Sequence, residues 1–169
     1  PALGKHWSAV GEGLRFRTSI ERRLFELAIL AVAVHWRSGH EWAAHARLAR
    51  EEGIGEEVVA ALRRGERPRF EKHDEEIVYA FAHELVSERR VSDAHYAAAS
   101  SLLGEQQLVE LVNALGYYIA LAAMLNAFLE RRIVHAQSLT PSLQAILIQL
   151  LKLILPAFAF LIVLPVMGV

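Results

Sequence analysis

Glu41 and His45 have the residue types and the spacing of a proton-transferring pair. Four residues apart on a helix, they lie on one face about one turn from each other. A carboxylate beside an imidazole raises the pKa of the histidine and orients its ring. Glu26 lies in an apolar segment upstream and can reach the same pocket from the preceding helix. With apolar walls around them, these three side chains form a candidate acid/base cluster for proton transfer next to a carbonyl group.

Other interpretations of the same residues stay open. A buried Glu26 needs a partner, which an arginine or a backbone amide can supply without any catalytic role. Glu41 and His45 can be an ordinary surface or core pair. Glu26, Glu41 and His45 can also ligate a divalent metal, since carboxylate oxygens and imidazole nitrogens are common ligands. Our prediction is a site that uses no metal and no cofactor.

Three further residues are candidates for substrate binding. Arg37 precedes the Glu41 segment and can hold a substrate carboxylate. Ser38 stands three residues before Glu41, which is capping-box spacing and requires no chemistry. Tyr117 follows Gly116 on a long apolar segment, where it either lines the pocket or packs within the domain or at a subunit interface.

The elements that must position these residues are all expected to be helices. Thr18 and Glu21 have capping-box spacing and predict a helix through Val34 that is apolar almost all round, hence central and buried. A short helical or irregular lead-in is expected around 6–10, and no segment shows the period of two that strands require. The remaining helices are predicted at 38–53, 55–64, from 74, at 92–103 and from 105 onwards.

Composition excludes several classes of function. The formal net charge of -1 argues against a nucleic-acid partner. The chain contains no cysteine, which excludes disulfides, thiolate metal sites and thiol nucleophiles. No basic-then-apolar leader is recognisable, and the absence of cysteine fits a reducing compartment. We therefore expect a cytoplasmic location, with membrane anchoring through the C-terminus as the alternative.

Several segments together resemble one known family. Residues 25–30 (Phe-Glu-Leu-Ala-Ile-Leu) precede 39–45 (Gly-His-Glu-Trp-Ala-Ala-His), and Gly-Tyr-Tyr at 116–118 and Leu-Asn-Ala-Phe at 125–128 follow. This set resembles the carboxymuconolactone decarboxylase-like family, which includes the alkylhydroperoxidase D-like proteins. The likeness runs from about residue 7 to residue 128. It implies the all-helical alkylhydroperoxidase D-like fold and assembly into homotrimers or homohexamers.

The peroxidase branch of that family carries Cys-x-x-Cys-x-x-x-His, with a histidine between the cysteines and a glutamate on the preceding helix. Ser38 and Glu41 stand at the two cysteine positions, and His40 and His45 stand at the histidine positions. Glu26 matches the upstream glutamate. The resemblance therefore implies a site with Glu26, His40, Glu41 and His45 as catalytic residues. It does not carry over peroxide reduction, because that chemistry needs a thiolate and a resolving thiol.

The sequence therefore predicts a carboxymuconolactone decarboxylase-like protein that performs decarboxylase- or lyase-like acid/base chemistry on a small organic acid or lactone. The alternative is a catalytically silent structural or membrane-associated oligomer of the same fold. A cleft that receives Glu26 and His45 would favour the enzyme, whereas a closed gap with Glu41 turned to solvent would favour the silent oligomer.

The end of the chain differs from the rest in composition. We divide the chain into a helical domain at 1–130 and a linker with a hydrophobic helix at 131–169. Residues 143–169 carry Lys152 as their only charge, although Pro156 and Pro165 interrupt the run. This length suffices for a membrane span of roughly 20 residues. Three interpretations remain: a C-terminal membrane anchor, a helix that packs on the domain or across an oligomer, and a non-native end.

Overall fold

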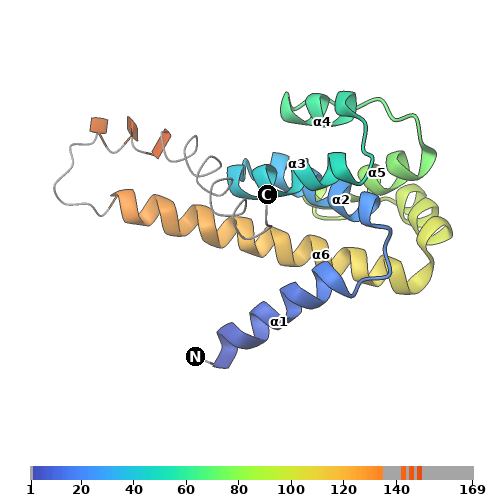
Figure 1. Cartoon of the computed structure of the whole chain (residues 1–169), viewed down its shortest axis with the longest axis horizontal. Helices are drawn as coiled ribbons and strands as arrows, with labels where there is room; N and C mark the ends of the chain where they lie inside the picture. The colour runs from blue at the N-terminus through green and yellow to red at the C-terminus, as the bar shows by residue number, and fades with distance from the viewer. Residues whose placement is uncertain (1, 135–141, 144, 147, 150–169) are drawn as a thin grey trace.

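The computed structural model describes residues 2–134 together with 142, 143, 145, 146, 148 and 149. Within this part the ordered elements are six helices and no strand, which confirms the all-α prediction (Figure 1). The helices are α1 (Ala2–Phe16), α2 (Arg22–His35), α3 (Gly39–Glu51), α4 (Glu56–Arg63), α5 (His73–Glu88) and α6 (Asp93–Val134).

Helix α2 forms the centre of the fold. Every residue from Arg23 to Ala33 is buried, as the apolar sequence of this segment predicted. A helix that is apolar on all faces needs cover on all faces. Helices α3, α4, α5 and α6 supply that cover by packing against α2. The two carboxylates and the imidazole of the candidate site therefore come from the core of the molecule and from the helix beside it.

The predicted capping boxes are wrong at both helix starts. Helix α2 begins at Arg22, with Glu21 and not Thr18 at the N-cap, and no side chain caps it. The Thr18 hydroxyl donates to the Glu110 carboxylate at 2.7 Å and accepts from the backbone N–H of Ile20 at 3.2 Å. Ser38 does occupy the N-cap of α3, but its side chain makes no capping hydrogen bond.

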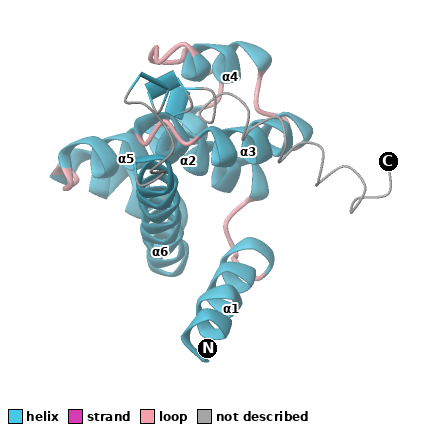
Figure 2. Ribbon diagram, turned by 90° about the vertical axis from the view of Figure 1, so that its left-hand side faces the viewer, coloured by secondary structure: helices cyan, strands magenta, loops and turns pink. Residues whose placement is uncertain are grey.

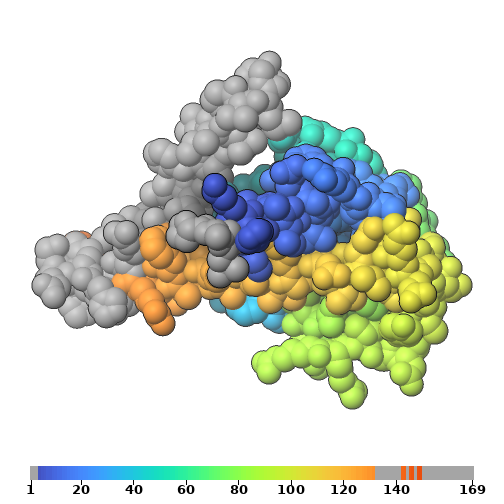
Figure 3. All heavy atoms as spheres, turned by 90° about the horizontal axis from the view of Figure 1, so that it is seen from below, coloured from blue at the N-terminus to red at the C-terminus, as the bar shows by residue number. Residues whose placement is uncertain are grey.

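Helix α1 is longer than expected, because the predicted lead-in at 6–10 is part of a helix of 15 residues. It packs against α6 and stands apart from α4 and α5 (Figure 2). Seen from below, its residues lie against the long yellow-to-orange surface of α6 (Figure 3). The position of α1 matters because it covers one wall of the candidate site.

Gly104 divides α6 into two helical segments, at the position where the sequence predicted a break. Its φ of 70° and ψ of 176° lie in a region that essentially glycine alone occupies. The stretch from Asp93 to Arg131 has a mean hydropathy of 1.7 and is, within the described residues, the one helix long and apolar enough to cross a membrane. One third of its most apolar window is buried inside the described part of the protein.

The predicted hydrophobic tail at 143–169 lies outside the described residues, apart from five positions between 143 and 149. The division of the chain at residue 130 and the three interpretations of the tail therefore stay predictions.

Candidate acid/base site

Glu26 and His45 form the closest contact of the site. Glu26 lies in the middle of α2 and His45 in the middle of α3, and the packing of these two helices brings the side chains together. The distance from His45 Nδ1 to Glu26 Oε2 is 2.5 Å. Both side chains are almost completely shielded from solvent. A carboxylate in this position fixes the orientation of the ring and leaves Nε2 as the nitrogen available for exchange.

Glu41 faces that second nitrogen. It lies one turn before His45 on α3, and its Oε2 is 3.5 Å from His45 Nε2. The other oxygen, Oε1, is buried and has no hydrogen-bond partner in the described part of the chain. An unpaired buried carboxylate oxygen is costly, so this oxygen is a ready acceptor for a water molecule or a ligand group.

Arg22 balances part of the negative charge. It lies one turn before Glu26 on α2, and its guanidinium approaches Glu26 Oε1 at 2.6 Å. The same guanidinium donates to the backbone carbonyl of Arg15 and stacks over the Phe25 ring at 5.1 Å. With His45 protonated, the formal charges of Glu26, Glu41, Arg22 and His45 sum to zero.

The environment of His45 raises its pKa above the ordinary value of 6.5. Burial alone would lower the pKa, because it penalises the charged ring. The hydrogen bonds to Glu26 and Glu41, together with the charges of the two carboxylates, outweigh that effect. His45 therefore holds a proton at a pH where a free imidazole would have begun to lose it.

Tyr118 supplies a phenol to the same site. Its ring meets the His45 ring edge-on, with the ring centres 5.0 Å apart and the planes at 89°. The hydroxyl is buried and has no hydrogen-bond partner among the described residues. Burial raises the pKa of Tyr118 well above its usual range, so the phenol stays protonated and can donate a hydrogen bond.

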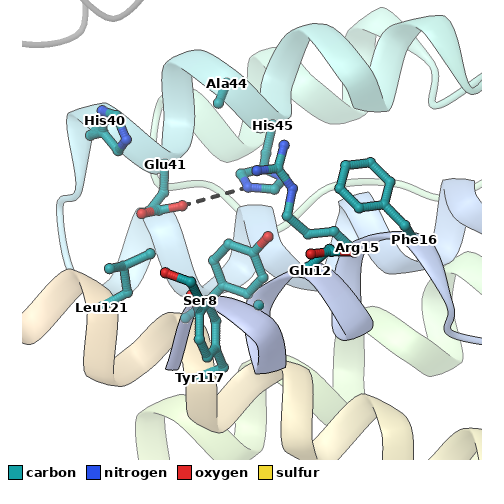
Figure 4. Close-up of a pocket in the computed structure, with 12 residues that line it drawn as sticks. Ser8, Glu12, Arg15, Phe16, His40, Glu41, Ala44, His45, Tyr117 and Leu121 are labelled. Atoms are coloured by element: carbon teal, nitrogen blue, oxygen red, sulfur yellow. Dashed lines mark ion pairs between the residues drawn. The ribbon is translucent and has the colours of Figure 1, made fainter. Parts of the chain in front are cut away.

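A cavity of about 310 Å³ opens beside these groups (Figure 4). Helix α3 contributes one wall, with Glu41 and His45, and α6 contributes another. Helix α1 closes the third side, with Arg15 and Glu12 near His45 in the close-up. The full lining is Ser8, Gly11, Glu12, Arg15, Phe16, His40, Glu41, Ala44, His45, Tyr117, Tyr118 and Leu121.

The cover formed by α1 depends on a close approach to α6. A Cβ atom at Gly11 would lie 2.3 Å from the Tyr117 hydroxyl oxygen, so any larger residue there would require the Tyr117 side chain to shift. The Trp7 ring stacks on Tyr117, with the ring centres 4.8 Å apart. Tyr117 therefore lines the cavity and also holds α1 in place.

The structure separates the predicted site residues into two groups. Glu26, Glu41 and His45 come together, although Glu26 lies behind His45 and does not line the cavity. His40 and Tyr117 do line it. Ser38 and Arg37 line a different hollow, at the junction of α2 and α3.

The sequence reasoning missed three residues of the site. Arg15 and Tyr118 reach it from α1 and α6, which no local spacing connects to His45. Arg22 had a local signal, because it precedes Glu26 by four residues. Within the described residues, no three His, Asp or Glu side chains are placed to hold a metal ion together.

Part of the chain that builds this site is similar to one known family. Residues 1–70 match the model of the carboxymuconolactone decarboxylase family. The match includes Glu26, Glu41 and His45, and it confirms the resemblance for the first 70 residues, whereas the motifs at 116–118 and 125–128 lie outside it. All of α5 and all of α6 lie beyond it, so Tyr117 and Tyr118 belong to a region that the carboxymuconolactone decarboxylase family model does not cover. No curated protein and no solved structure matches the chain.

Proposed function

We propose that this protein is an acid/base enzyme of the carboxymuconolactone decarboxylase type that acts on a small organic acid or lactone. The observation that carries the proposal is the 2.5 Å contact of buried Glu26 with Nδ1 of His45, whose ring lines a cavity. Pairs of this kind hold an imidazole in one orientation for general acid/base catalysis. A merely structural pair has no need of an adjoining cavity.

Each group has a distinct role in this proposal. Glu26 is a positioning residue, because it fixes His45 and does not reach the cavity. His45 is the catalytic acid and base, acting through Nε2. Glu41 relays the proton between Nε2 and the cavity, since its Oε2 faces the ring and its Oε1 is unpaired.

The cavity suits a small anionic substrate. A volume of about 310 Å³ lies at the lower end of the range for ligand pockets. Arg15 is the cation on its wall that can hold a carboxylate, and this is the role that sequence reasoning gave to Arg37. The Tyr118 hydroxyl donates a hydrogen bond to a substrate carbonyl oxygen, and His40 stands on the wall nearest to Glu41 (Figure 4).

The reaction balances without a redox partner. In a decarboxylation, the bond from carbon to the departing carboxylate breaks, CO₂ leaves, and the electron pair stays on the substrate as an enolate conjugated with its carbonyl group. Tyr118 stabilises the enolate oxygen by its hydrogen bond. Nε2 of His45 then delivers its proton to carbon, and solvent returns a proton through Glu41. Thiol peroxidase chemistry has no place here, because the chain contains no cysteine.

Self-association and location belong to the same proposal. Val109, Val112 and Met124 on α6 expose about half of their surface, which supports burial of this helix against further copies in a trimer or hexamer. The proposed location is the cytoplasm, with membrane contact through the C-terminal segment as the alternative. Multi-angle light scattering and membrane fractionation of the full chain test these two points.

The test of the activity is an assay of a panel of unsaturated lactone acids, with release of CO₂ and loss of absorbance as readouts. We expect turnover by the wild type, a loss of at least 100-fold in kcat for His45→Gln, and a changed pH profile with a smaller loss for Glu26→Gln. His73→Gln is the matched control, because His73 is exposed and does not line the cavity. Equal rates for the wild type and His45→Gln on every substrate would remove His45 from the mechanism.

A further inference from the structure

A second cavity lies at the junction of three helices and shares no residue with the acid/base cavity. It has a volume of about 430 Å³ and is formed by the end of α2, the start of α3 and the end of α4. Its rim is cationic and its floor is apolar. The proposed function does not use this cavity.

Three arginines define the rim: Arg37, Arg63 and Arg64. Arg64 forms an ion pair with Glu66 at 2.7 Å. Arg37 and Arg63 form no ion pair with any residue that the structure describes. Guanidinium groups remain charged at any physiological pH and match the geometry of carboxylate and phosphate oxygens. The rim therefore carries an excess of positive charge that no side chain of the described protein neutralises.

Ser38 provides an independent sign of a ligand in the same cavity. The residue lines the cavity and is 2% exposed, yet its Oγ is buried without any hydrogen-bond partner in the described part of the protein. It also leaves the first turn of α3 without a side-chain cap. Buried hydroxyls almost always have a partner, and an uncapped helix start carries free N–H groups and a partial positive charge.

The floor of the cavity indicates that the ligand is organic. Val34, Trp42 and Leu62 present apolar side chains to it. A smaller hollow of about 190 Å³ adjoins the same floor, since it shares Val34 and Leu62. The two volumes exceed what an inorganic ion fills, and an apolar surface of this kind suits an aliphatic or aromatic body.

We propose that this cavity binds a small organic anion, with its carboxylate or phosphate group among Arg37, Arg63 and Ser38 and its apolar body on Trp42. The site is separate from the proposed acid/base function, and neither depends on the other. A carboxylate and a phosphate monoester share the chemistry that the rim recognises, so the choice between them is left to the experiment.

The experiment is calorimetric titration of the full chain, in a fixed concentration of non-ionic detergent, with three probes of similar shape. Benzoate and phenyl phosphate carry the two anionic groups, and benzyl alcohol is the neutral match. We expect both anions to bind, with the stronger one identifying the class, and benzyl alcohol to bind at least tenfold more weakly.

Variants then locate the binding site. We expect Arg63→Gln and Arg37→Gln each to weaken anion binding about tenfold, which is the loss of one charge-assisted hydrogen bond. Ser38→Ala should weaken it by a smaller factor. Arg69→Gln, an exposed arginine outside the cavity, is the matched control and should bind as the wild type does.

Arg15→Gln and His45→Gln separate the two cavities, because they change only the acid/base site. A binding event that these two variants retain and Arg63→Gln weakens supports the proposal, whether or not a second event in the acid/base cavity is lost with Arg15→Gln. Binding that is lost with Arg15→Gln and kept with Arg63→Gln would place the anion in the other cavity and overturn it. Absence of binding by both anions, or equal binding of benzyl alcohol, would overturn it as well.

Discussion

The contact between Glu26 and His45 should make a pH-dependent contribution to the free energy of unfolding. Glu26→Gln keeps the size of the side chain and removes its charge, so it tests the contact without opening a cavity. His45→Gln removes the other partner. Combining the two substitutions gives a double-mutant cycle that isolates the interaction between these residues.

The expected magnitude follows from burial and geometry. Removing one partner of a buried ion pair costs about 3–5 kcal/mol, because the other charge is left without compensation. Two features reduce the cost in this site. His45 can release its proton, and the Arg22 side chain is 27% exposed and can turn to solvent. We therefore expect Glu26→Gln to lower stability by about 3 kcal/mol near pH 6, the lower end of that range.

The sign of the pH dependence follows from the raised pKa of His45. A group whose pKa is higher in the folded state contributes stability that is fully present below its unfolded value, here 6.5, and is lost as the pH rises through the folded value. The coupling between Glu26 and His45 should therefore be largest near pH 6 and should decrease steadily above it. Each tenfold difference in proton affinity corresponds to about 1.4 kcal/mol.

Urea denaturation of the wild type, both single variants and the double variant measures the coupling at fixed protein and detergent concentrations. NMR titration of the His45 ring gives the pKa directly in the wild type and in Glu26→Gln, where it should fall. His73→Gln controls for a general effect of removing a histidine. A coupling below about 0.5 kcal/mol near pH 6, or one that stays constant with pH, would refute this account of the site.

Three further predictions concern the elements around the site. Gly11→Ala should loosen α1, because the new Cβ would meet the Tyr117 hydroxyl at 2.3 Å, and faster amide exchange in α1 would show it. Gly13→Ala is the matched control, since Gly13 has open space around it, and it should stabilise α1 by up to about 1 kcal/mol. Gly104→Ala should lower stability by about 1–3 kcal/mol in thermal or urea unfolding, because φ is 70° and ψ is 176° there. Burial alone would raise the pKa of Glu110, but hydrogen bonds from Thr18 and its neighbours lower that pKa to about 2. The loss of stability in Glu110→Gln should therefore be constant above pH 4.5 and should shrink as the pH falls towards 2. Acid titrations of unfolding that run in parallel for the wild type and Glu110→Gln would contradict this last expectation.

Local patterns in the sequence predicted much of the architecture. The apolar run after Arg22 predicted the buried central helix, and Gly104 predicted the break in the long helix. Both predictions succeeded because these features follow from neighbouring residues alone. The spacing of Glu41 and His45 placed them on one face for the same reason. Glu26 was expected to reach the pocket itself, but it contacts His45 and does not line the cavity; that it would have a polar partner follows because a carboxylate in an apolar helix needs one.

Features that depend on distant parts of the chain were not predicted. By its position in the sequence, the Thr18 hydroxyl fits the N-cap of a helix. In the structure it instead donates a hydrogen bond to the carboxylate of Glu110, 92 residues away. Tyr118 and Arg15 reach the cavity through the packing of α6 and α1, which no spacing reveals. Arg37 is adjacent to the site in sequence, yet the turn between α2 and α3, where its φ is 49°, places it in the other cavity.

The charge balance around Glu26 and His45 affects the protonation of His45 when an anion binds in the cavity. Two carboxylates, one guanidinium and one imidazolium sum to zero, and loss of the proton from His45 leaves an excess of one negative charge. An incoming carboxylate therefore favours the protonated ring. Substrate binding and proton uptake are then linked, and the heat of binding depends on the ionisation enthalpy of the buffer.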